Sequence, residues 1–132
     1  MCVSKVGKVY TAKRRKRGFK VVMPASFSNP PKYFAIFQRY TYHKGILHFA
    51  YLHNSFRWTP CKLNKVFPLG FICFEYLKDA EKYKQQMINS GYRDIKVVIT
   101  HAPKGSTITR VIEEDTWSAF STDQLIVGIE VD

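Results

Sequence analysis

Residues 70–91 read GFICFEYLKDAEKYKQQMINSG, and this stretch decides the fold class. Its first part, GFICFEY, is aromatic and apolar enough to predict a strand. From residue 77 the apolar side chains recur at spacings of three and four, which predicts an amphipathic helix over about 77–90, ended by Gly91. Tyr76 stands at the expected N-cap, where Ser or Asp is favoured. The stretch therefore predicts a strand that runs directly into the principal helix.

Strand-like segments lie on both sides of this stretch. Alternating or β-branched sequence predicts strands at 5–12, 19–23, 46–52, 95–100, 106–113 and 124–131. Residues 33–42, YFAIFQRYTY, fit a strand by content and a short helix by spacing, so both stay open. Neither an internal repeat nor a Gly- and Ser-rich linker divides the chain. We therefore expect one α+β domain over 1–132, with a mainly antiparallel sheet and one principal helix.

The strand and helix of residues 70–91 also carry a resemblance. A loosely defined group of small, mostly bacterial and phage proteins of unknown function has a Gly-Phe-x-x-Phe strand that runs into a helix with an acidic-Ala pair. The matching residues here are Gly70, Phe71, Phe74, Asp79 and Ala80. The segment GFKVV also resembles the first strand of that group, and the likeness covers about a third of the chain. The resemblance implies a compact α+β fold and a phage accessory role, without any activity or binding residue.

Size and composition suit one packed core. The chain has 132 residues, of which 45% are hydrophobic. It has no apolar run long enough to span a membrane, and its first ten residues lack the apolar core of a secretory signal. Cys2, Cys61 and Cys73 form no CxxC pair and are predicted to be free thiols in a reducing compartment. These features predict a cytoplasmic protein without a membrane partner, in the host-cell cytoplasm if a phage encodes it.

The charge is unevenly distributed along the chain. The formal net charge is +11, yet residues 1–74 hold fourteen Lys or Arg and no Asp or Glu. Residues 75–132 hold seven Lys or Arg against ten acids. A field of this kind attracts anions and disfavours cationic partners.

Residues 13–18, KRRKRG, are the densest basic run. Between two expected strands they are predicted to form a hairpin loop, in which Gly18 would supply the positive φ of the return. Such a cluster binds phosphates without reading base sequence, whereas a solvated loop tip or a nuclear localisation signal would need no ligand. The predicted phosphate-binding residues are Lys13, Arg14, Arg15, Lys16, Arg17 and Lys20, with Arg39, Lys44 and Arg57 from the following segment.

Nine aromatic side chains lie between Tyr33 and Trp58, interleaved with cations. Aromatic rings beside cations are suited to single-stranded nucleic acid, because bases stack on the rings. Most of these rings fit a strand core equally well, and Tyr and Trp are the types that carry a polar end to solvent. The predicted stacking residues are Tyr40, Tyr42, Tyr51 and Trp58.

Motifs for catalysis and metal binding are weak. The spacing of His43, His48 and His53 places consecutive members on opposite strand faces, so no metal site is expected. His43, Tyr51 and Glu130 resemble the His, Tyr and Glu of ADP-ribosyltransferases, which implies NAD as a substrate. Residues 101–107, HAPKGST, fit a hairpin turn or a phosphate-binding nest. The chain lacks a P-loop, a GxGxxG motif and a nucleophile elbow, so no catalytic residue is predicted.

The sequence therefore predicts a non-enzymatic protein that binds a phosphate-rich ligand, foremost nucleic acid, through a basic N-terminal surface with stacking aromatics. One alternative is a phage counter-defence protein that sequesters a signalling nucleotide or inhibits a host nucleoprotein complex. The other is the NAD-using transferase. DNA, RNA, a phosphate-bearing nucleotide and an acidic host protein stay open as partners. No cofactor and no particular oligomeric state are predicted.

Overall fold

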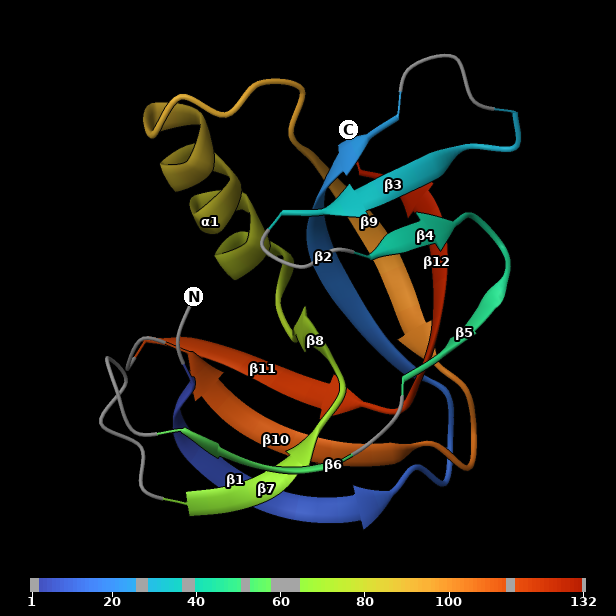
Figure 1. Cartoon of the computed structure of the whole chain (residues 1–132), viewed down its shortest axis with the longest axis vertical. Coiled ribbons are helices and arrows are strands. Elements are labelled where there is room, and N and C mark those ends of the chain that lie inside the picture. Colours follow the sequence, from blue (N-terminus) through green and yellow to red (C-terminus); the bar gives the residue numbers. More distant parts are fainter. Residues whose placement is uncertain are drawn as a thin grey trace.

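The computed structural model describes residues 3–25, 29–36, 40–50, 53–57, 65–113 and 116–131, with the backbone alone for 53–57, 65–67 and 113. These residues form twelve strands and one helix (Figure 1). The first seven strands are β1 (Val3–Thr11), β2 (Lys16–Pro24), β3 (Lys32–Ala35), β4 (Thr41–His43), β5 (Leu47–Phe49), β6 (His53–Arg57) and β7 (Lys65–Leu69). The remaining elements are β8 (Phe71–Phe74), α1 (Leu77–Asn89), β9 (Lys96–Ala102), β10 (Thr107–Glu113), β11 (Trp117–Thr122) and β12 (Gln124–Glu130).

Ten strands form one antiparallel sheet, which runs in the order β1-β10-β11-β8-β2-β9-β12-β5, with β3 on β2 and β4 on β3. Strands β6 and β7 form a separate antiparallel pair. Figure 1 shows the sheet divided into a lower group around β1, β10 and β11 and an upper group around β2, β3, β9 and β12. Strand β8 links them, because Phe74 pairs with Phe19 of β2. The mainly antiparallel sheet with one helix in the described residues confirms the prediction, and α1 matches the expected range of about 77–90.

Helix α1 packs on the upper group through its apolar stripe. Ala80 and Tyr83 are buried in a cluster with Val21 of β2 and Val97 of β9. Burying a side chain of this kind contributes about 1.5–3 kcal/mol, which holds a helix with no N-terminal side-chain cap on Tyr76. The helix ends as predicted at Gly91, whose φ of 97° is in the left-handed region.

A second cluster fills the space between the upper strands. Its fully buried members include Val22, Val98, Leu125 and Val127, and β3 and β4 add Tyr33 and Tyr42. The motif residue Phe71 belongs to this cluster, whereas Phe74 belongs to the cluster under α1. The strand–helix motif of residues 70–91 therefore joins the two cores.

The basic run is not a hairpin loop, and this corrects the sequence prediction. Strand β1 pairs with β10, and β2 pairs with β9, β8 and β3, so β1 and β2 are not partners. The run is split: 13–15 form the connection, and 16–18 begin β2. Gly18 has no positive φ; it is a buried strand residue, where a Cβ would come within 2.8 Å of the Phe120 ring. Close packing between strands, rather than a turn, requires this glycine.

Several strands escaped the sequence prediction. Strand β11, WSAFST, has Ser121 and Thr122 buried as fully as Phe120, so no alternation marks it. Strands β6 and β7 were also missed. Residues 33–42 contain parts of β3 and β4, which supports the strand interpretation of that segment. In the part of the chain that the structure describes, no helix has the length and apolar character to cross a membrane.

Candidate functional site

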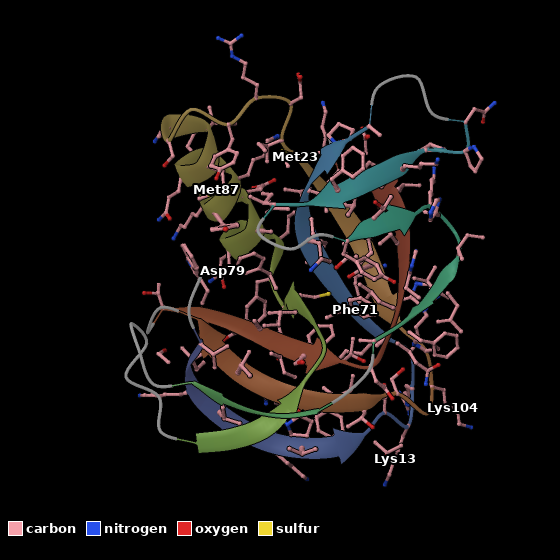
Figure 2. The ribbon with its side chains drawn as sticks, viewed as in Figure 1. Lys13, Met23, Phe71, Asp79, Met87 and Lys104 are labelled. Carbon is pink, nitrogen blue, oxygen red and sulfur yellow. The ribbon has the colours of Figure 1, made fainter. Side chains whose placement is uncertain are left out.

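Residues 12–15 turn from β1 to β2 against the connection between β9 and β10. The amide of Ala12 donates to the Ser106 carbonyl at 2.8 Å, and the amide of Gly105 donates to the Ala12 carbonyl at 2.8 Å. These bonds hold Lys104 beside Lys13, and Figure 2 shows both at the same end of the molecule. We call the exposed cations of this region the basic corner: Lys13, Arg14, Arg15, Arg17 and Lys104.

Two successive amides of the 103–106 turn, those of Gly105 and Ser106, are used within the protein. Besides the bond from Gly105 to Ala12, the amide of Ser106 donates to the Pro103 carbonyl at 3.1 Å. A phosphate nest needs successive free amides. The nest interpretation of residues 101–107 is therefore wrong. The simple hairpin is wrong too, because β9 and β10 have different partners in the sheet.

Strand alternation sends two of the predicted phosphate ligands inward. Nζ of Lys16 lies 3.9 Å from Oε1 of Glu75 and 5.0 Å from the centroid of the Phe120 ring. Lys20 donates to the Ile72 carbonyl at 2.6 Å and lies 5.3 Å over the Tyr42 ring. Both therefore stabilise the interior, and this corrects their assignment to a phosphate-binding surface. Arg17, between them in β2, points to the opposite face and is exposed.

Of the three remaining predicted cations, the structure describes the side chain of Lys44 alone. Lys44 lies in the turn between β4 and β5, where it is half-buried and its amide donates to the Pro31 carbonyl. Arg57 is in β6, where the backbone alone is described, and Arg39 lies outside the described residues. Among the predicted cations whose side chains are described, Lys13, Arg14, Arg15 and Arg17 therefore belong to the basic corner.

Two predicted stacking residues belong to the core. The Tyr42 side chain has no exposed surface, and its ring lies 4.9 Å from that of Tyr40 and 5.7 Å from that of Phe71. Tyr40 is half-buried, and the centroid of its ring lies 5.2 Å from that of the Phe71 ring. A base cannot reach the face of a fully buried ring, so the structure removes Tyr42 as a stacking platform, whereas Tyr40 is partly exposed and its role stays a prediction. Tyr51 and Trp58 lie outside the described residues.

The Tyr42 hydroxyl is buried without a hydrogen-bond partner of good geometry. Burial raises the pKa of this phenol, and the nearby Lys20 ammonium acts against that rise. Burial likewise raises the pKa of the Cys73 thiol, which lies 3.5 Å from Oγ1 of Thr100. The phenol and thiol are both kept protonated, as members of a structural polar cluster rather than as nucleophiles.

His43 and His48 lie side by side. The rings of His43 and His48 are stacked with centroids 6.0 Å apart. The His43 amide donates to Nε2 of His48 at 3.0 Å, and Nδ1 of His48 lies 3.0 Å from the Tyr40 hydroxyl oxygen. Burial lowers the pKa of His48. Within the described residues, no group of three His, Cys, Asp or Glu side chains could hold a metal ion.

Glu130 has a different partner from the one that the transferase interpretation needs. The Tyr33 hydroxyl donates to Oε1 of Glu130 at 3.1 Å. Burial, and then the hydrogen bond to the Glu130 carboxylate, raise the pKa of Tyr33 to about 12. His43 instead stacks on His48, and no contact joins it to Glu130 in the described part of the chain. The two residues therefore form separate structural contacts.

Four strands present one continuous row of side chains on the outer face of the sheet. Arg17 of β2 is opposite His101 of β9, His101 is opposite Ile126 of β12, and Ile126 is opposite Leu47 of β5. Directly opposed residues of antiparallel strands point to the same face. Phe49, opposite Gln124, belongs to this face and is 67% exposed. We call Arg17, His101, Ile126, Leu47 and Phe49 the open sheet face.

Sequence reasoning missed His101, Lys104 and Phe49 as members of a surface. Phe49 had no usable signal, because alternation about the polar His48 would send Leu47 and Phe49 inward, whereas the structure buries His48 and exposes both of them. His101 had none, because its position depends on the pairing of β9 with β2 and β12. Burial, and then the charge of Arg15, lower the pKa of His101, which places Arg15 close to this face.

Comparison with protein families, curated proteins and solved structures finds no match for the chain. The resemblance of residues 70–91 to small phage proteins therefore stays a prediction.

Proposed function

We propose that this protein is a non-enzymatic binding protein that engages nucleic acid through the basic corner. The observation that carries the proposal is the gathering of Lys13, Arg14, Arg15, Arg17 and Lys104, all exposed, around two backbone connections that hydrogen-bond to each other. No ion pair involves these five residues within the described part of the chain. Like charges held close together repel, and a polyanion relieves that repulsion.

Two described acids, Glu75 and Asp123, already have partners within the protein. Oε1 of Glu75 lies 3.3 Å from Nε of Arg110 and 3.9 Å from Nζ of Lys16, and neither cation belongs to the basic corner. Oδ1 of Asp123 accepts the Thr107 amide at 2.8 Å. Among the described residues, no carboxylate forms an ion pair with the basic corner, which supports a positive field that an anion can reach. Phosphate binding there would release counterions and would depend steeply on salt.

The two alternatives have less support. A nucleotide-sequestering protein needs an enclosed aromatic pocket, whereas Tyr40, Tyr42, His48 and Phe71 pack on one another. The described hollows of about 430 and 250 Å³ lie beside α1 and beside Glu75, and both are open. For a transferase, His43 and Glu130 would have to face one substrate, and they contact different residues.

The test is a titration of labelled DNA and RNA at about 50 to 300 mM NaCl, read by fluorescence anisotropy. The test variant is Lys13→Gln/Arg14→Gln/Arg15→Gln, which changes the connection and no strand residue. The matched control is Lys78→Gln/Lys82→Gln/Arg93→Gln, which removes three exposed cations from α1 and the segment after it. We expect the test variant to flatten the log–log salt slope by roughly 2 to 3, because each lost phosphate contact removes about 0.7 to 0.9.

The control variant should keep a slope close to that of the unmodified protein. Absence of salt-dependent binding by the unmodified protein would overturn the proposed function. Equal loss in the two variants would show a diffuse charge effect and would overturn the role of the basic corner.

A further inference from the structure

The open sheet face and the basic corner meet at Arg17. This residue is exposed in β2 and begins the row that crosses to His101, Ile126 and Leu47. Four neighbouring strands span roughly 14 Å, since adjacent strands are about 4.8 Å apart. A cationic edge and an apolar edge are thus presented together on one side of the sheet.

Helix α1 covers one end of the sheet and leaves the other end open. Val21 and Val97, which pair across β2 and β9, are buried under the helix. Arg17 and His101, which pair nearer the other end of the same two strands, are exposed and half-buried, respectively. The side chains of this end are therefore accessible to a ligand, whereas those under the helix are not.

Phe49 is the most exposed large apolar side chain among the described residues, at 67%. It extends from β5, whose other side buries His48 against Tyr40 and Tyr42. The strand therefore has a fixed orientation, and the Phe49 ring is held outward. Exposing a large aromatic ring to water has a cost, and a flat stacking partner would remove it.

Duplex and single-stranded ligands use such a surface differently. A duplex offers phosphates to the cations but keeps its base faces within the stack, so it gains little from the Phe49 ring. A single strand offers both phosphates and free base faces, and stacking on an aromatic side chain tolerates any base sequence. The combination of an exposed ring with nearby cations therefore favours the single strand.

We propose that the open sheet face binds single-stranded nucleic acid, with Phe49 stacking on a base while Arg17 and the basic corner hold phosphates. This inference rests on the proposed function and names its ligand class. It assigns Phe49 to base contact and the cations to the phosphates of the nucleic acid. A Phe49 variant should therefore change single-strand affinity without changing the salt slope, whereas variants of the cations should change the salt slope.

The test compares Phe49→Ala with Phe34→Ala. Phe34, on β3, is also an exposed phenylalanine, at 43%, and lies on a strand that pairs with β2 and β4 rather than β12. The probes are pyrimidine oligonucleotides of about 12 nucleotides, as DNA and as RNA, and a duplex of the same length. We expect Phe49→Ala to weaken single-strand binding roughly 5- to 150-fold with an unchanged salt slope, and to leave duplex binding unchanged. Phe34→Ala should bind all probes like the unmodified protein.

Two results would overturn the inference while leaving the proposed function intact. One is a duplex affinity equal to the single-strand affinity; the other is the same effect from both phenylalanine variants. Phe49→Leu keeps an apolar side chain of similar bulk without a ring. It should fold like the unmodified protein and still show the weaker single-strand binding expected of Phe49→Ala. Sedimentation of the unmodified protein gives a third check. A dimer that Phe49→Ala dissociates, with single-strand affinity unchanged, would assign this face to a second copy of the chain instead.

Discussion

Gly18 of β2 lies directly against the ring of Phe120 of β11. A Cβ added at Gly18 would come within 2.8 Å of two carbons of that ring and within 2.9 Å of Cβ of Cys73. Both neighbours are buried in the main cluster and cannot move aside freely. We therefore expect Gly18→Ala to lower the free energy of unfolding by about 1–3 kcal/mol, as overpacked cores do, in urea titrations followed by circular dichroism.

Gly7→Ala is the matched control for this prediction. Gly7 is also a strand glycine, and its added Cβ would meet Arg110 at an ordinary 3.5 Å. This variant should change the free energy of unfolding by no more than about 0.5 kcal/mol. If Gly18→Ala is as mild as Gly7→Ala, Gly18 is not required for close packing.

The placement of Gly18 in a strand could not be predicted from the local sequence. The KRRKRG run has the composition of a turn, so Lys16 and Lys20 are predicted beside Lys13 on one exposed loop. Tertiary pairing with β9 instead extends β2 back to Lys16, and alternation then turns Lys16 and Lys20 inward. Local sequence cannot report this, because the carbonyl of Ile72 that accepts Lys20 lies in another strand.

Elements with their own periodicity were predictable. Helix α1 and its end at Gly91 follow from spacing and glycine conformation, and both agree with the structure. Strand β11 was not predictable, because partners on both sides bury its Ser121 and Thr122 and remove the alternation. The open sheet face likewise depends on strand order, so the local sequence does not indicate it, and the inward His48 and outward Phe49 reverse what their polarity would predict.

Cys73 should resist alkylation in the folded protein. Its side chain is buried, and burial raises the pKa of its thiol, so both access and thiolate are lacking. Treatment with iodoacetamide near neutral pH should leave the Cys73 peptide unmodified, as read by mass spectrometry. The same treatment in concentrated urea should modify it fully. Rapid native labelling at Cys73 would contradict the burial of β8.

His48 should make the folded state less stable in mild acid. Burial lowers its pKa, so the unfolded chain binds a proton near pH 6.5 while the folded chain stays neutral. The stabilisation is present above about pH 6.5 and is lost as pH falls toward the lower pKa of the folded state. The urea concentration at the unfolding midpoint should therefore decrease as pH is lowered from about 7.5 to 5.5.

The variant His48→Gln separates this effect from other titrations. It loses the contacts with Tyr40 and the His43 amide, so it should be less stable throughout, but its midpoint should depend less on pH. His101, whose pKa is also lowered, contributes in the same direction, and His101→Gln removes that share. An unchanged pH dependence in both variants would exclude the histidines as its source.

His101 should also make nucleic-acid binding depend on pH. In the free protein, burial and then the charge of Arg15 lower the pKa of His101, and Arg17 stands opposite it across the β2–β9 pair. A phosphate held by Arg15 and Arg17 would favour the imidazolium, so binding would take up a proton. Affinity should then rise as pH falls from about 7.5 to 5.5, by less than about tenfold per unit for one proton. His101→Gln should abolish this rise while retaining binding at pH 7.5, and His48→Gln, if folded, should retain the rise. An affinity that stays constant with pH in the unmodified protein would place the bound phosphates away from His101.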